Sequence, residues 1–171
     1  MRTIRARGCS GMLSRRRSKS GASVSMPFDP RGVANLILDA ADNRLVSLSN
    51  LALQKVLYFV HGKFLIEERS PLIAGSFEAW QFGPVNLPVY ESFKSFGARA
   101  IGSRATKRDI RTGEVSIAQL PADQNVRRKI AEVAAPFLTM NAGRLVELSH
   151  ATNSPWDRIT RNPEGGRSYG L

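Results

Sequence analysis

The sequence predicts a mainly α-helical fold of the α+β class, a compact bundle of about five to six helices with a short β-strand or hairpin element. Apolar residues recur at helical spacing in several separate segments, and residues that cap helices well precede these segments. Only short stretches alternate with period two, and glycine or proline residues lie beside them. The chain has 171 residues, of which 42% are hydrophobic, so it can bury the core of one ordinary domain.

The first 25 residues differ in composition from the rest of the chain. They hold seven basic residues and no acidic one, which leaves 18 basic against 14 acidic residues for the remainder. Because residues 1–25 lack apolar periodicity, we expect a disordered basic leader. Its interpretations stay open: a solvated tail, a segment like a transit peptide, a nucleic-acid-binding arm that uses Arg15, Arg16 and Arg17, or an upstream extension of a chain that begins at Met26.

Cysteine content and hydropathy bear on the compartment. Cys9 is the only cysteine, so the chain forms no internal disulfide, which suits a reducing cytoplasm. No apolar run approaches the roughly 20 residues that span a bilayer, and residues 1–25 lack the apolar stretch of a secretory signal. We therefore expect a cytoplasmic protein with no membrane contact.

The first two helices are expected to follow good capping residues. Asp29 is a suitable N-cap and Pro30 a suitable first helical residue, and Asp42-Asn43 ends this helix. Its apolar face consists of Val33, Leu36, Ile37 and Ala40. Ser47 and Ser49 offer caps for the second helix. Its apolar stripe extends for about four turns and consists of Leu53, Val56, Leu57, Val60 and Phe64.

A short strand and a third helix are expected next. Residues 77–82 are rich in aromatic side chains and alternate with period two, which is typical of a strand. Gly83 and Pro84 follow, so we expect this strand to end in a tight turn. Pro88 can open a third helix, which Gly97 ends as a C-cap. The shared face of this helix consists of Val89, Phe93 and Phe96.

The second half of the chain predicts a hairpin and further helices. Residues 98–120 are ambiguous, with a hairpin indicated around Arg111-Thr112-Gly113. Asp123 is expected to cap a fourth helix. Its apolar stripe consists of Val126, Ile130, Val133, Phe137 and Met140. Another helix is expected from about Ala142 to Ala151, and it buries Leu145 and Leu148. A last turn starts at Pro155, and residues 161–171 are expected to form a flexible tail.

A polar and aromatic stripe on the second helix is the candidate site. Gln54, Tyr58 and His61 lie at i, i+4 and i+7, beside the apolar stripe. In one interpretation they are half-buried residues whose polar ends bond to the nearby backbone. In the other they form a partner-binding edge, which nearby Lys55 and Glu78 extend, since tyrosine is enriched in binding hot spots.

Catalytic and metal-binding patterns are weak in this sequence. His61 and His150 are the only histidines, and neither H-E-x-x-H nor C-x-x-C occurs. Ser149 and His150 are neighbours, which point in different directions on a helix and therefore give no triad signal. We expect no enzyme activity, no cofactor and no metal site, and we keep a hydrolase that uses His61 or His150 as a weaker alternative.

Several sequence segments occur in an order that is specific to one family. Residues 51–62 read LALQKVLYFVHG, and residues 77–85 read FEAWQFGPV, with Tyr90 shortly after. An LSH element ends at His150, and Pro155-Trp156 gives a PW element. Together these segments resemble the motifs of the Panacea (SocA-like antitoxin) domain family, over about residues 26–160.

This resemblance implies a small, mostly helical antitoxin of prophages and other mobile elements. Family members neutralise the toxin product of a neighbouring gene by direct protein–protein binding. One type of member also delivers its toxin to a ClpXP-type protease, so such a protease is a further candidate partner. The alternative function is a nucleic-acid-binding or regulatory module of a mobile element that uses the basic leader.

The motif residues are also expected to have architectural roles. Trp80 can fill the groove between helices, Gly83 and Pro84 can redirect the chain, and Trp156 can close the other end. If either ring is fully buried, its loss costs about 3–5 kcal/mol. The structural motif set consists of Trp80, Gly83, Pro84, Tyr90, His150, Pro155 and Trp156.

Overall fold

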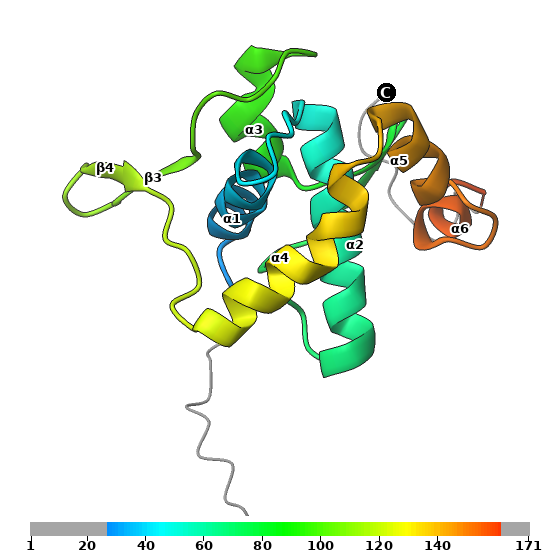
Figure 1. Cartoon of the computed structure of the whole chain (residues 1–171), viewed down its shortest axis with the longest axis horizontal. Coiled ribbons are helices and arrows are strands. Elements are labelled where there is room, and N and C mark those ends of the chain that lie inside the picture. The colour runs from blue at the N-terminus through cyan, green and yellow to red at the C-terminus, as the bar shows by residue number, and fades with distance from the viewer. Residues whose placement is uncertain (1–26, 162–171) are drawn as a thin grey trace, which may run out of the picture.

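The computed structural model describes residues 27–161, and this part of the chain is mainly α-helical, as predicted. Its helices are α1 (Pro30–Asp42), α2 (Asn50–Glu68), α3 (Leu87–Phe93), α4 (Gln124–Leu138), α5 (Ala142–Ser149) and α6 (Pro155–Arg161), with a 3-10 turn η1 (Lys94–Phe96). Its strands form two antiparallel pairs, β1 (Glu78–Trp80) with β2 (Gly83–Val85), and β3 (Thr106–Arg108) with β4 (Val115–Ile117). Figure 1 shows the β3–β4 hairpin on one side of the helices and α6 on the opposite side.

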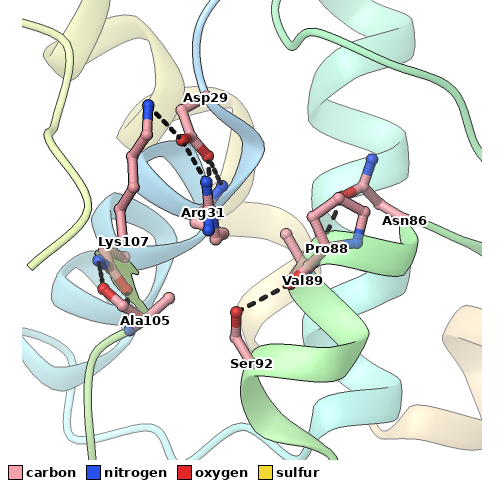
Figure 2. Close-up of polar contacts among 9 residues, drawn as sticks. Asp29, Arg31, Asn86, Pro88, Val89, Ser92, Ala105 and Lys107 are labelled. Atoms are coloured by element: carbon pink, nitrogen blue, oxygen red, sulfur yellow. Dashed lines mark hydrogen bonds and ion pairs between the residues drawn. The ribbon is translucent and has the colours of Figure 1, made fainter. Parts of the chain in front are cut away.

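Helix α1 begins and ends where the sequence predicts. The Asp29 carboxylate accepts a hydrogen bond from the Arg31 backbone N–H at 3.0 Å, and Pro30 occupies the first turn. The same carboxylate pairs with the Arg31 guanidinium at 2.8 Å and with Lys107 Nζ at 3.7 Å (Figure 2). Because Lys107 lies in β3, this cap also ties the β3–β4 hairpin to the start of α1.

Helix α2 is the central element of the fold. Ser49 caps it by accepting a hydrogen bond from the Ala52 backbone N–H, and α2 contacts α1, α3, α4, α5 and β2. The predicted stripe is confirmed, because its members Leu53, Val56, Leu57, Val60 and Phe64 are all fully buried. Burial of each such side chain contributes about 1.5–3 kcal/mol, so this one stripe supplies much of the core.

The aromatic segment forms a hairpin, whereas the sequence predicted one strand that ends at a turn. Residues 81–82 form the turn, and Gly83 and Pro84 belong to the second strand, with Trp80 paired to Gly83. Helix α3 then starts at Leu87, one residue before the predicted start, because Asn86 is the residue that caps it. Figure 2 shows Asn86 at this helix start beside Pro88 and Val89.

The predicted hairpin near residue 112 is confirmed as β3 and β4. The Asp109 carboxylate accepts hydrogen bonds from the backbone N–H groups of Arg111 and Thr112, at 2.7 and 3.0 Å. Gly113 adopts a positive φ of 73°, which suits glycine in a turn. All residues of both strands are exposed, so this hairpin adds little to the core.

The buried face of α4 is rotated from the predicted one. The buried line consists of Ile130, Ala134 and Leu138, at i, i+4 and i+8, and it faces α1 and α2. Of the predicted stripe, only Ile130 is fully buried, while Val126, Val133, Phe137 and Met140 are half-buried. The sequence spacing gives the period of the stripe but not which edge of it is covered, since tertiary packing decides that.

Helix α5 shows a similar difference. Leu145 is buried as expected, but Leu148 is only half-buried and Ser149 is buried instead. The Ser149 hydroxyl donates a hydrogen bond to the Val146 carbonyl oxygen at 2.8 Å, so the buried polar group is satisfied. The half-buried side chains Phe137 and Leu148 therefore remain on the surface of the domain.

Candidate partner-binding site

Gln54 holds the point where β2 meets α3. Its side chain is 1% exposed, and its Oε1 accepts a hydrogen bond from the Asn86 backbone N–H at 2.8 Å. The Asn86 side chain donates to the Ser76 carbonyl oxygen at 3.1 Å and caps α3 by accepting from the Val89 N–H at 3.4 Å. A buried amide is costly unless it is paired, so these bonds favour one placement of the hairpin on α2.

Lys55 is buried beneath the same hairpin. Its side chain is 0% exposed, its Nζ donates a hydrogen bond to the Pro84 carbonyl oxygen at 2.9 Å, and burial lowers its pKa to about 7. Gly83 has a φ of 93°, and an added Cβ would lie 2.5 Å from Ser149 Oγ and 3.0 Å from Lys55 Cε. A glycine is therefore required at this contact. We call Gln54, Lys55, Gly83, Pro84 and Asn86 the motif junction.

The two tryptophans join the C-terminal helix to the hairpin. The Trp156 indole N–H donates to the Trp80 carbonyl oxygen at 2.9 Å, and the Trp156 ring stacks on His150 with centroids 3.7 Å apart. The Trp80 indole N–H donates to Glu78 at 2.7 Å, and its ring meets Tyr90 edge to face. Both tryptophan rings are half-buried, so the energy of a fully buried ring does not apply to them. Pro155 starts α6 beside them.

Of the five predicted partner contacts, two are buried and three are half-buried. Gln54 and Lys55 are buried, because the first half of α2 is covered by the hairpin and α3, and their side chains cannot reach a partner in this conformation. Tyr58, His61 and Glu78 are half-buried and keep accessible surface. Their role in partner binding stays a prediction.

Tyr58 and His61 share an aromatic cluster with Phe77. The ring centroids of Tyr58 and Phe77 are 5.3 Å apart, and those of His61 and Phe77 are 5.6 Å apart. Burial raises the pKa of the Tyr58 phenol and lowers the pKa of the His61 imidazole, so both groups are favoured in their neutral forms. This neutral aromatic edge is suited to contact with apolar groups.

An open apolar groove of about 740 Å³ runs from this edge between α2 and α4. Its principal lining residues are Tyr58, Phe59, Gly62, Val133, Pro136 and Phe137. The rings of Phe59 and Phe137 stack across the two helices, with centroids 4.8 Å apart. We call this the α2–α4 groove. Of its residues, only Tyr58 was predicted as a partner contact. Gly62, a glycine inside a strongly helical segment, was a further sequence feature that could have drawn attention to this surface.

A second hollow of about 490 Å³ lies beside the first hairpin. Trp80, Phe82 and Tyr90 line it, together with Gln54. The Phe82 side chain at the tip of the hairpin is 59% exposed. The motif residues therefore border one hollow, while Tyr58 borders the other.

The remaining sequence predictions concern the arginine run, membrane contact and metal binding. Arg15, Arg16 and Arg17 lie outside the described residues. Within residues 27–161, no helix combines the length and the apolar composition that a membrane crossing requires. The same residues contain no group of three or more His, Cys, Asp or Glu side chains placed to hold a metal ion.

The fold and this site define a small helical domain with an apolar groove on its surface, and comparison with known proteins identifies its family. The family model described as "Antitoxin SocA-like, Panacea domain" matches residues 53–157. The chain therefore belongs to the SocA-like Panacea family, as the sequence motifs predicted. It is 46% identical over 143 residues to "Antitoxin SocA" of Caulobacter vibrioides (strain NA1000 / CB15N). The aligned region covers 84% of this chain and 76% of that relative. No solved structure matches the chain. These findings support an antitoxin role.

Proposed function

We propose that this protein neutralises a toxin by binding it directly, and that the toxin is the product of an adjacent gene. Membership of an antitoxin family supports the role, and the α2–α4 groove supports the means. The observation that carries the proposal is an open apolar groove of about 740 Å³ bordered by Tyr58. Exposed apolar hollows of this kind are typical of protein-binding surfaces.

The motif residues support binding rather than chemistry. Gln54, Lys55 and Asn86 each bond to a backbone group of a neighbouring segment, so their polar atoms hold the fold together. Substrate chemistry needs polar groups that reach a substrate. A scaffold fixed by such bonds presents a rigid surface, and a rigid surface lowers the entropic cost of binding a partner.

Co-expression tests the proposal. The adjacent open reading frame is induced alone and together with this protein, started at Met1 or at Met26, and growth is measured. We expect growth arrest with the adjacent product alone and recovery with either form of this protein. Arrest by the adjacent product that neither form relieves would reject the proposal.

Neutralisation by binding can be distinguished experimentally from delivery of the toxin to a protease. An antitoxin that acts by binding restores growth while the amount of toxin stays constant, including in a host that lacks ClpXP. An adaptor requires the protease and shortens the half-life of the toxin. We propose neutralisation by binding, so we expect rescue without ClpXP. We also expect the two purified proteins to elute as one complex in size-exclusion chromatography, at low and at high salt.

A further inference from the structure

Gly62 lies in the interior of α2, where glycine is a poor helix former compared with alanine. Two other glycines are required by close contacts: a Cβ on Gly32 in α1 would lie 1.8 Å from the Gln119 carbonyl oxygen, and one on Gly83 in β2 would lie 2.5 Å from Ser149 Oγ. A Cβ on Gly62 would meet nothing within 4 Å. The folded chain therefore does not need a glycine at this position, and the bare backbone is open to a partner.

The surface around Gly62 is shaped by aromatic side chains. Phe59 precedes it by one turn of α2 and stacks on Phe137 of α4, so the two helices are joined along the groove. Ile66 follows it by one turn, lines the groove and is 77% exposed. A small residue between larger apolar ones lets a partner backbone approach closely at Gly62.

The groove favours a helical partner over a strand. Apart from Ser154, its lining residues lie in α2, α4, α5 and α6, so a strand laid into it would find no strand edge to pair with. The N–H and C=O groups of that strand would lose water without gaining hydrogen bonds, which is costly. A helix satisfies its own backbone groups and can present an apolar face to an apolar groove.

Opposite charges flank the groove on its two walls. Lys63 lines it from α2 and Glu132 from α4. Each is paired within its own helix, Lys63 with Glu67 at 2.9 Å and Glu132 with Arg128 at 3.7 Å, and all four side chains are solvent-exposed. Exposed pairs of this kind contribute little energy, so they oppose a new pairing with a partner only weakly. A complementary partner carries an acidic residue on the α2 side and a basic residue on the α4 side.

We propose that the α2–α4 groove takes one amphipathic helix of the toxin, with a small or flat face over Gly62 and apolar side chains against Phe59 and Phe137. An acidic residue of that helix lies near Lys63 and a basic one near Glu132. This inference rests on the proposed function, because it assumes a protein toxin as the partner.

A bulky side chain at Gly62 tests the groove without harming the fold. Gly62→Leu projects into open space and replaces glycine with a better helix former, so we expect unchanged or higher thermal stability. We expect its affinity for the purified product of the adjacent gene to fall at least tenfold by calorimetry. Gly143→Leu is the matched control, because Gly143 is also a helical glycine, is exposed in α5 and lies outside the groove lining.

The charge pattern gives a second test. Glu132→Lys is expected to weaken binding several-fold, and the loss should shrink as salt is raised. Glu114→Lys makes the same charge change in the exposed β3–β4 turn, and we expect it to leave the affinity unchanged. Equal effects of both variants would overturn the proposed flanking contacts.

The partner segment can be identified by photo-crosslinking from the exposed groove end. With p-benzoylphenylalanine in place of Ile66, we expect crosslinks to one toxin segment with apolar residues at i, i+3, i+4 and i+7. Crosslinks to a strand would overturn the helical occupant. Full affinity of Gly62→Leu, with affinity lost in Phe82→Ser, would overturn the groove in favour of the second hollow. Absence of any binding by the wild-type protein would instead reject the proposed function itself.

Discussion

The motif junction and the α2–α4 groove both include residues of α2, on successive turns of that helix, yet the two regions differ in polarity and in exposure. The junction is polar, buried and closed: Gln54 and Lys55 each bond to a backbone group beneath the hairpin. The groove is apolar and open, with Phe59 and Gly62 on its surface. The difference teaches that the most recognisable residues of this chain build the scaffold, while the surface available to a partner carries little sequence signal.

Physical chemistry explains this division. A buried amide or ammonium needs a particular partner at a particular distance, so few residue types can replace Gln54 or Lys55. Apolar contact depends mainly on shape and area, so many residues can line a groove equally well. A binding surface of the second kind can differ between proteins that keep the same scaffold.

The pH dependence of stability is the largest effect expected at the junction. Burial lowers the pKa of Lys55 to about 7 in the folded protein from its ordinary value of 10.5. Between these two values the unfolded chain binds a proton that the folded chain does not, so the free energy of unfolding rises with pH. We expect a rise of up to about 5 kcal/mol from pH 7 to pH 10.5, measured by urea unfolding.

Lys55→Met supplies the control for this measurement. The variant has no amine to titrate, so its stability should lack the rise, whatever the loss of the bond to Pro84 costs. His150, whose pKa is lowered by burial and by nearby Lys55, titrates below this window and does not contribute to the rise. Parallel curves for the two proteins would show that Lys55 is not buried as described.

Substitution of Gly83 distinguishes a close contact from a strained backbone. Gly83→Ala introduces a Cβ that collides with Ser149 at a positive φ, so we expect a loss of about 2–4 kcal/mol in the free energy of unfolding. Gly75→Ala is the matched control, because Gly75 has a φ of 83° but nothing within 4 Å of an added Cβ. We expect it to lose only about 1 kcal/mol. Equal losses would mean that β2 does not pack closely on α5.

A smaller effect is expected where α6 meets the hairpin. Trp156→Phe keeps an aromatic ring beside His150 but removes the hydrogen bond to the Trp80 carbonyl oxygen, so stability should fall by about 1 kcal/mol. Trp80→Phe removes a bond to the nearby, half-buried Glu78, and we expect a smaller loss. Thermal unfolding of both variants measures the difference, and a larger loss in Trp80→Phe would contradict it.

Local features of the fold were predictable from the sequence. Asp29, Ser49 and Asp123 cap their helices as expected, because a cap is a bond between a side chain and an amide two or three residues away. The turn at Gly113 is local in the same way. The buried face of α4 was not predictable to the residue, because the placement of α1 and α2 decides that Ala134 is fully buried and Phe137 only half-buried.

The candidate site was only partly predictable. For Gln54, the interpretation as a residue that is partly buried and bonded to the backbone was one of the two left open, and the structure buries it further. The burial of Lys55 was not foreseen, because lysine is almost never fully buried. The groove arises from the crossing of α2 and α4, and no spacing within either helix encodes that crossing. Gly62 gave a local sign of an open surface, because it is a helix-weakening residue inside a strong helix and the packing of α2 does not require it.

The central claim is that the junction sets stability while the groove sets binding, and it is tested most directly by measuring both quantities on one pair of variants. The free energy of unfolding and the affinity for the adjacent gene product are determined for Gly83→Ala and Gly62→Leu at a temperature where both are folded. The account predicts that Gly83→Ala loses stability and keeps its affinity, whereas Gly62→Leu keeps its stability and loses affinity. Affinity lost in Gly83→Ala and retained in Gly62→Leu would contradict it.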